Sequence, residues 1–234
     1  MKLSRKLIPA MVMLLVSAVL MSTASFAWFA MNKNVVATGM NVKAQADSIF
    51  LEIKGTEDTE WGVTGTNDVD AELLPVAHEV FSSAADIEAA DSWYYHYVTD
   101  PTKANVGKSD ENKVSLQTST EGYVVKTTYQ VRLNDNMVQE AIDLRVSSIT
   151  ITAGKGIVAI VRCGDMYKEF DASNTSVAKE NGLIAAEMDE NVLNVDVYIF
   201  INGNDENVFT NNAPNLEGSV IFTLTVDAKP QQNG

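Results

Sequence analysis

The chain has 234 residues and an ordinary globular composition, with 46% hydrophobic residues, 21% charged residues, 13 Gly and 5 Pro. This composition excludes disorder throughout and collagen-like repetition. The first 27 residues hold three bases and no acid, so the remainder has 14 bases against 31 acids, a formal net charge of −17. Such a surface repels phosphate backbones and argues against nucleic-acid binding.

The N-terminal segment has the three regions of a secretory signal peptide. Three basic residues precede a long uncharged stretch, which ends in small residues with Ser25 and Ala27 at the −3 and −1 positions. The pattern predicts a signal helix over residues 1–27 that signal peptidase removes before Trp28. An uncleaved membrane anchor is the alternative, because an uncharged run of about 20 residues can cross a bilayer. Both interpretations place the protein outside the cytoplasm, secreted into an extracellular matrix or held at the cell surface, with membrane contact only through this segment.

The rest of the chain has the period of β-strands. Residues 28–46 are predicted to form an N-terminal arm and a first strand, and residues 47–234 a β-sandwich domain. Apolar residues alternate with polar ones along several segments, as they do in strands with one buried face. The alternating apolar positions are Met40, Val42 and Ala44; Ile49, Leu51 and Ile53; every second residue from Tyr123 to Leu133; Val195 to Ile201; and Val220 to Val226.

Three local departures from this alternation are predicted. The phase slips near Ser147 and Ser148, which indicates a bulge. Ser83 and Asp86 have the spacing of a capping box, so a short helical run should follow Ser83. A second short helical turn is expected to end at Gly182.

Residues 99–121 are polar without a sustained period and predict a long surface excursion. Many short strands with almost no helix favour an all-β fold. The expected architecture is a jelly-roll-type β-sandwich preceded by the N-terminal signal helix.

The chain has few residues in patterns that could support catalysis. His78 and His96 are the only histidines. The segment after His78 stops one residue short of the metalloprotease motif, whose second His would hold zinc. No Gly-x-Ser-x-Gly elbow is present, and nothing selects a carboxylate pair for glycoside hydrolysis. We therefore expect no enzymatic activity, no catalytic residue and no cofactor.

Cys163 is the only cysteine and cannot form an internal disulfide. It follows an apolar run, so we expect a small buried core residue. A reactive or intermolecular thiol is the alternative.

One polar loop after a predicted strand offers several oxygen ligands. A calcium ion is a weak expectation there, because the loop does not match an EF-hand and a polar turn explains it more simply. The weak candidate ligands are Asn202, Asn204, Asp205 and Glu206.

A dense aromatic run forms the second binding candidate. Trp93, Tyr95 and Tyr97 would share one face of a strand, where their rings could stack on the sugars of a polysaccharide or contact another subunit. Burial in the core is the alternative for such a set.

The junction between the signal and the first strand resembles a known group of exported proteins. The chain runs Ala27-Trp28-Phe29 at the predicted cleavage site and then enters an alternating strand over residues 35–44. This arrangement is similar to that of Gram-positive proteins with the SipW-type signal peptide, which include the TasA and camelysin biofilm-matrix fibre proteins. The C-terminal part, residues 195–202, 211–213 and 218–228, also resembles the closing hairpin of that group.

The resemblance implies a jelly-roll subunit whose newly exposed N-terminus lies as a strand in the next subunit. The sequence departs from the fibre-forming members at Ala30 and Met31, where a polar or acidic residue is expected. The residues that would form the donor arm are Trp28, Phe29, Met31, Val35 and Val36.

We therefore expect an exported structural subunit of an extracellular fibre or biofilm matrix, whose partners are copies of itself or a related matrix protein. The alternative is a monomeric or membrane-tethered β-sandwich that binds glycans at the cell surface.

Overall fold

The computed structural model describes most of the chain after residue 35. The described residues are 36–47, 50–73, 75–89, 92–95, 113–114, 123–134, 140–152, 156–189, 191–205, 208 and 219–229, with Met13, Val16 and Ser17. Two compact units are present, Met1–Asn34 and Val35–Gly234, and the second holds all the described strands. Among the described residues no helix is both long enough and apolar enough to cross a membrane.

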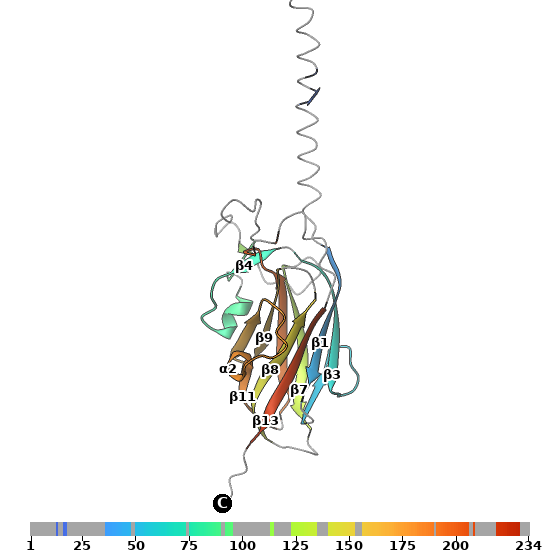
Figure 1. The fold of residues 1–234 in the computed structure, drawn as a ribbon, viewed down its shortest axis with the longest axis vertical. Helices are drawn as coiled ribbons and strands as arrows, with labels where there is room; N and C mark the ends of the chain where they lie inside the picture. The colour runs from blue at the N-terminus through green and yellow to red at the C-terminus, as the bar shows by residue number, and fades with distance from the viewer. Residues whose placement is uncertain are drawn as a thin grey trace, which may run out of the picture. The chain divides into compact units, whose positions relative to one another are not determined.

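The described strands form three sheets (Figure 1). The first sheet has the order β11 (Leu183–Met188), β8 (Ala141–Ile151), β13 (Ser219–Ala228), β1 (Val36–Ala46) and β3 (Thr64–Glu72). The second has the order β10 (Met166–Phe170), β9 (Ile157–Cys163), β12 (Leu193–Ile201), β7 (Val124–Leu133) and β2 (Leu51–Lys54). The third is small, with the order β4 (Val76–His78), β5 (Trp93–Tyr95) and β6 (Lys113–Val114). Neighbouring strands are antiparallel except β1 and β13, which are parallel.

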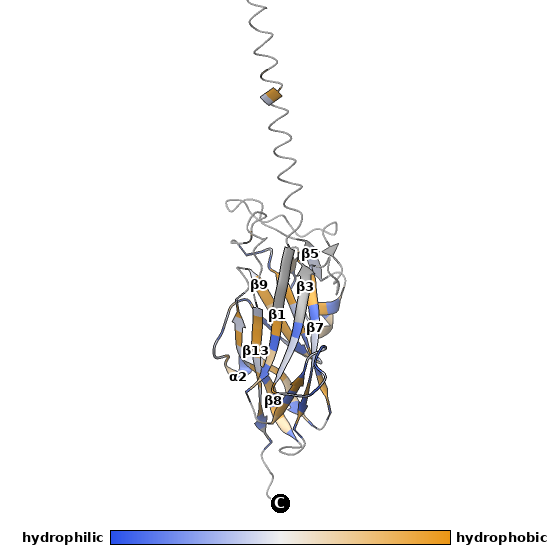
Figure 2. Cartoon of the chain, turned by 90° about the vertical axis from the view of Figure 1, so that its right-hand side faces the viewer, coloured by the Kyte–Doolittle hydropathy of each residue, from blue (hydrophilic) through white to orange (hydrophobic). Residues whose placement is uncertain are grey.

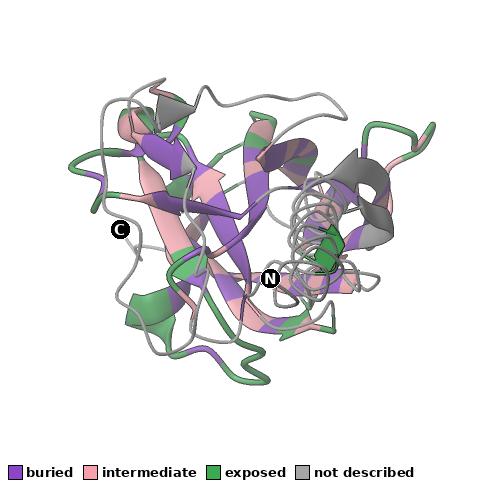
Figure 3. Ribbon diagram, turned by 90° about the horizontal axis from the view of Figure 1, so that it is seen from above, coloured by how far each residue is buried: buried purple, intermediate pink, exposed green. Residues whose placement is uncertain are grey.

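The two five-stranded sheets share one hydrophobic core, which we call the inter-sheet core. Hydrophobic and buried positions lie along the strands, and exposed positions gather on the connecting segments (Figures 2 and 3). From Val125 to Leu133 on β7 every second residue is buried, as the alternation predicts, and Val124 is buried as well. The all-β prediction is confirmed. The largest buried members of this core include Tyr129, Phe222, Leu51, Ile53, Leu133, Leu144 and Ile149.

The predicted local departures are also present. The pairing of β8 with β13 shifts register opposite Thr223 and Leu224, between Val146 and Ser148, which is the bulge predicted there. The 3₁₀-helix η1 (Ala84–Glu88) follows the Ser83 capping box, and the short helix α2 (Lys179–Gly182) ends at the predicted glycine.

The structure adds one detail and corrects one expectation. Within the predicted surface excursion of residues 99–121, Lys113 and Val114 form β6 and pair with β5. The second sheet does not have only one buried face: β9 and the second half of β12, from Val197 to Ile201, are buried on both faces, because η1 and the third sheet cover the outer side. The residues packed on that side form a second cluster, which we call the outer core: Val76, Phe81, Ile87, Trp93, Val124, Val158, Ile160, Tyr198 and Phe200.

Candidate functional site

The N-terminal strand β1 lies inside the first sheet. It pairs in parallel with β13 and antiparallel with β3. Val42 and Ala44 are fully buried, and the hydroxyl of Tyr129 on the opposite sheet donates a 2.6 Å hydrogen bond to the Val42 carbonyl. A strand with neighbours on both sides and a buried face is firmly held.

Only one predicted arm residue belongs to the described part of the chain. Val36 opens β1, and its backbone pairs with Glu72 of β3. Val36 thus belongs to the first sheet of its own chain. The other predicted arm and cleavage residues lie outside the described residues: Ser25, Ala27, Trp28, Phe29, Met31 and Val35.

The expectation that Trp93, Tyr95 and Tyr97 form a binding face is wrong for Trp93. Trp93 is fully buried in the outer core, and its indole N–H donates a 2.8 Å hydrogen bond to the carbonyl of Ile87. A ring enclosed on all sides cannot stack on a sugar, so Trp93 drops out of the expected platform. The backbone of Tyr95 pairs with Val76 in the third sheet, whereas its side chain and all of Tyr97 lie outside the described residues.

His78 belongs to the same aromatic cluster. Its ring stacks on Phe81 with centroids 4.3 Å apart and meets Trp93 edge-on at 5.2 Å. Its Nε2 lies 3.3 Å from a carboxylate oxygen of Glu169 on β10, and its Nδ1 lies 2.7 Å from the Glu79 carbonyl. These contacts join the third sheet to the edge of the second sheet and give His78 a packing role. His96 lies outside the described residues.

A polar cluster fastens η1 to the outer face of the second sheet, and we call it the Glu88 clasp. One Glu88 carboxylate oxygen accepts hydrogen bonds from Lys126 at 2.6 Å and from the Tyr198 hydroxyl at 2.7 Å. Arg162 lies 3.5 Å from the same oxygen, and Asp196 lies 3.2 Å from the Lys126 ammonium. These contacts link β7, β9 and β12 to η1.

The clasp keeps its carboxylate ionised. The hydrogen bonds from Lys126 and Tyr198 lower the pKa of Glu88 from 4.5 to about 2. Burial of the Tyr198 hydroxyl, with its hydrogen bond to Glu88, raises the pKa of that tyrosine to about 12. At neutral pH neither group changes its protonation, so the clasp is suited to holding elements together rather than to transferring protons.

The calcium candidates form a turn. The Asn202 side-chain oxygen accepts a 2.9 Å hydrogen bond from the Asn204 N–H, and the Asn202 carbonyl accepts one from the Asp205 N–H. Glu206 lies outside the described residues. In the described ranges no three His, Cys, Asp or Glu side chains are grouped so that they could hold a metal ion.

Cys163 ends β9 and lies in the inter-sheet core, where it is 7% exposed. Burial raises the pKa of its thiol from 9.0 to about 11. The thiolate is the reactive form, so this thiol is poorly reactive in the folded protein.

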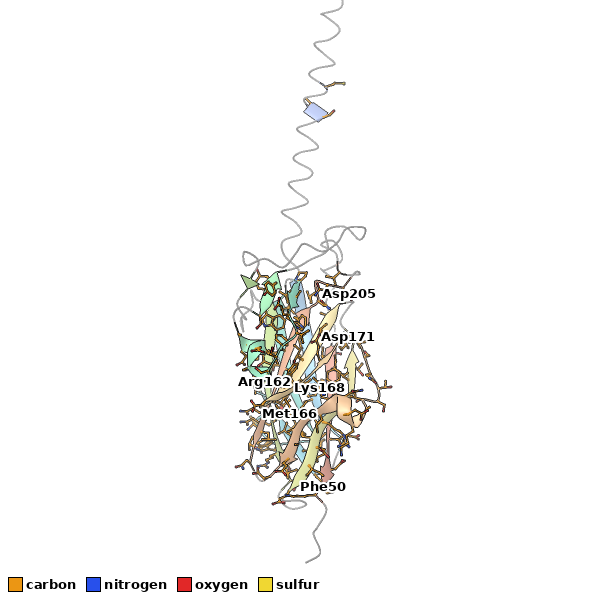
Figure 4. All side chains as sticks on the ribbon, turned by 90° about the vertical axis from the view of Figure 1, so that its left-hand side faces the viewer. Phe50, Arg162, Met166, Lys168, Asp171 and Asp205 are labelled. Atoms are coloured by element: carbon orange, nitrogen blue, oxygen red, sulfur yellow. The ribbon has the colours of Figure 1, made fainter. Side chains whose placement is uncertain are left out.

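A cavity of about 410 Å³ opens beside the end of β10. Sequence reasoning did not find it, because the residues that line it belong to one edge strand and to the connection that follows. The lining residues are Lys168, Glu169, Phe170, Asp171, Ala172, Ser173, Asn174, Val177 and Asn181. In Figure 4, Met166, Lys168 and Asp171 follow one another along this part of the molecule.

Comparison with protein-family models, curated proteins and solved structures finds no match for this chain.

Sequence reasoning also missed the Glu88 clasp. Glu88, Lys126 and Tyr198 are separated by tens of residues, and a local pattern carries no signal for contacts of that kind. The alternation on β7 gave the one partial signal, because it places Lys126 on the face opposite the inter-sheet core, which is the face that the clasp occupies.

Proposed function

We propose that the protein is an exported structural subunit of an extracellular fibre or biofilm matrix, assembled by donation of its N-terminal arm to a neighbouring copy. The carrying observation is the apolar sequence Trp28-Phe29-Ala30-Met31, which is followed within a few residues by β1, a strand paired on both sides in the first sheet of an all-β body. Cleavage before Trp28 would leave two aromatic side chains at the very start of the mature chain.

Burial favours this use of the arm. Each large apolar side chain that leaves water contributes about 1.5–3 kcal/mol. Three such residues, Trp28, Phe29 and Met31, offset much of the conformational entropy lost when a short segment becomes ordered. A free sheet edge supplies the backbone hydrogen bonds that an added strand needs. Because a head-to-tail contact of this kind does not close on itself, it generates a filament.

The strand order supports a jelly-roll assignment. From β7 to β13, successive strands alternate between the first and second sheets, except for the β9–β10 hairpin. This path gives the orders β11-β8-β13 and β10-β9-β12-β7, which supports the interleaved pair of Greek keys expected of a jelly roll. In this interpretation β1 is an additional strand between β13 and β3.

Export accords with the chemistry of the body. An unpaired cysteine is at risk in an oxidising compartment, and the buried, poorly reactive thiol of Cys163 avoids that risk. The acidic surface keeps unassembled copies soluble.

Electron microscopy of the purified chain beginning at Trp28 tests the proposal. We expect filaments from this protein and only monomers after deletion of residues 28–35, with the thermal unfolding of the monomer unchanged because β1 remains intact. Val80→Ser is the matched control, since it removes a side chain that is 93% exposed on a loop and should leave filaments intact. A chain from Trp28 that stays monomeric and is retained on polysaccharide would favour the glycan-binding alternative.

A further inference from the structure

We infer that the free edge of β10, with the cavity at its end, receives residues 28–35 of a second copy. The inference rests on the proposed strand donation and adds the place where the donated arm binds. Among the described strands, the two large sheets have four outer strands: β3 and β11 in the first sheet and β2 and β10 in the second.

Two outer strands are covered by the loop between β2 and β3. The N–H of Ile53 on β2 donates to the Gly62 carbonyl at 2.6 Å, and the Gly62 N–H donates back at 3.1 Å. On β3 the N–H of Thr66 donates to the Asp58 carboxylate. The rest of β3 carries Asp68, Asp70 and Glu72, and charged residues on an edge strand discourage pairing.

The third outer strand, β11, is irregular. Its pairing with β8 shifts between Leu183 and Ala185. A bulge of this kind twists an edge away from regular pairing and is one of the ways that proteins protect their sheet edges.

The remaining outer strand, β10, is regular. It pairs with β9 over five consecutive residues without a register shift. The turn between them has two residues, Gly164 and Asp165, so the flanking pair is hydrogen-bonded and the pairs alternate from there. The N–H and C=O groups of Tyr167 and Glu169 therefore point to the free edge. Among the described residues β10 pairs with β9 alone.

The cavity continues this edge. Three of the residues that line it, Lys168, Glu169 and Phe170, belong to β10 itself. Its volume of about 410 Å³ lies within the range of about 300–1,000 Å³ typical of ligand sites. Phe170 and Val177, both also members of the inter-sheet core, supply the apolar part of a wall whose other residues are mostly polar.

Charge complementarity favours the arm as the occupant. The only charged side chain within residues 28–35 is Lys33, and cleavage before Trp28 would add a positive α-amino group. The receiving surface presents the carboxylate of Asp171 and that of Glu169, which also lies 3.3 Å from His78 Nε2, whereas the ammonium of Lys168 is bound to the Glu180 carbonyl at 3.0 Å. A cationic arm thus meets an anionic edge, which steers association between two copies that otherwise repel each other.

Disulfide cross-linking of the chain from Trp28 tests the inference. The test variant combines Glu169→Cys with Met31→Cys in a Cys163→Ala background. A second variant carries Lys33→Cys in place of Met31→Cys, and position 33 lies two residues further along the same face of an extended arm. The matched controls carry Glu187→Cys on β11 or Asp70→Cys on β3 with the same arm cysteine. Because a bound arm holds the paired thiols at high effective concentration, we expect about tenfold more intermolecular disulfide at Glu169→Cys than at either control.

The outcomes separate this site from the proposed function. Filaments that cross-link equally at the controls, or at none of the three edges, would overturn β10 as the receiving edge and leave strand donation standing. A protein without cysteine substitutions that forms no filaments would overturn strand donation, and this inference with it.

Discussion

The inter-sheet core and the outer core bury the second sheet from opposite sides, but they are built differently. The inter-sheet core is largely aliphatic and comes from long strands with many neighbours. The outer core is rich in aromatic rings, with Phe81, Trp93 and Phe200 packed at centroid distances of 5.0 to 5.6 Å. Its covering elements are short: η1 has five residues, and β4 and β5 have three each.

This difference indicates two levels of stability. Long strands with paired neighbours open only when the whole domain unfolds, whereas short elements held by side-chain contacts open at a lower free energy. The outer core depends on specific polar links, such as the Glu88 clasp and the Trp93 indole hydrogen bond. We therefore expect the outer core to respond locally to mutation and the inter-sheet core to respond globally.

The largest effect is expected in the inter-sheet core. Phe222 is fully buried and meets Tyr129 edge-on at 5.6 Å, so Phe222→Ala leaves a cavity between the sheets. We expect a loss of about 3–5 kcal/mol in the free energy of unfolding. Urea denaturation followed by tryptophan fluorescence and by circular dichroism should show one coincident transition. Thr150→Ala, at an exposed position on β8, should change stability little.

A smaller and local effect is expected from Trp93→Phe. The change keeps an aromatic ring but leaves the buried carbonyl of Ile87 without its indole donor, at a cost of about 1–3 kcal/mol. Hydrogen exchange should show lower protection in η1 and the third sheet, while β8 and β13 keep theirs. Equal loss of protection in both regions would contradict the separation of the two cores.

The Glu88 clasp should give a pH-dependent contribution. The folded pKa of Glu88, about 2, lies below its ordinary value of 4.5, so the stabilisation is present above about pH 4.5 and is lost as the pH falls toward 2. Because the side chain is 42% exposed, solvent screening limits the effect to about 1 kcal/mol or less. Urea denaturation of Glu88→Gln between pH 2 and 6 should show a weaker pH dependence than the unsubstituted protein. Glu57→Gln, on an exposed loop, should retain the full dependence.

The difference between the two cores also explains which parts of the fold could be predicted from the sequence. The inter-sheet core follows from period-two alternation, which is local, so the strands around Val125, Val197 and Phe222 were predictable. Burial of Trp93 depends partly on β12, where Phe200 packs against its ring, and local spacing carries no signal for that contact. Asn67 is a similar case: it is 2% exposed because its amide bridges the Thr56 N–H to the Thr128 carbonyl, a contact set by the packing of β3 against β7.

The proposed assembly site also has one part that the sequence could predict and one part that it could not. The apolar arm could be predicted from its residue types, because an apolar start after a cleavage site is a local feature. Its proposed receiving edge could not be predicted, because an outer strand is defined only by the order of the strands in its sheet. The peptide Met166–Phe170 has no property that separates it from an inner strand until β9 is placed on one side and no described strand on the other.

The finest separation of the two cores comes from labelling the thiol of Cys163, which is left unsubstituted. Its thiol lies in the inter-sheet core with a pKa near 11 instead of 9.0, so the thiolate fraction at pH 8 is lower by about a hundredfold. Labelling by a thiol reagent should therefore report opening of the inter-sheet core. We expect Phe222→Ala to accelerate labelling and Trp93→Phe to leave its rate unchanged, since the outer core can open without separating the two large sheets. Faster labelling in Trp93→Phe would mean that the outer core supports the inter-sheet core and that the two unfold as one unit.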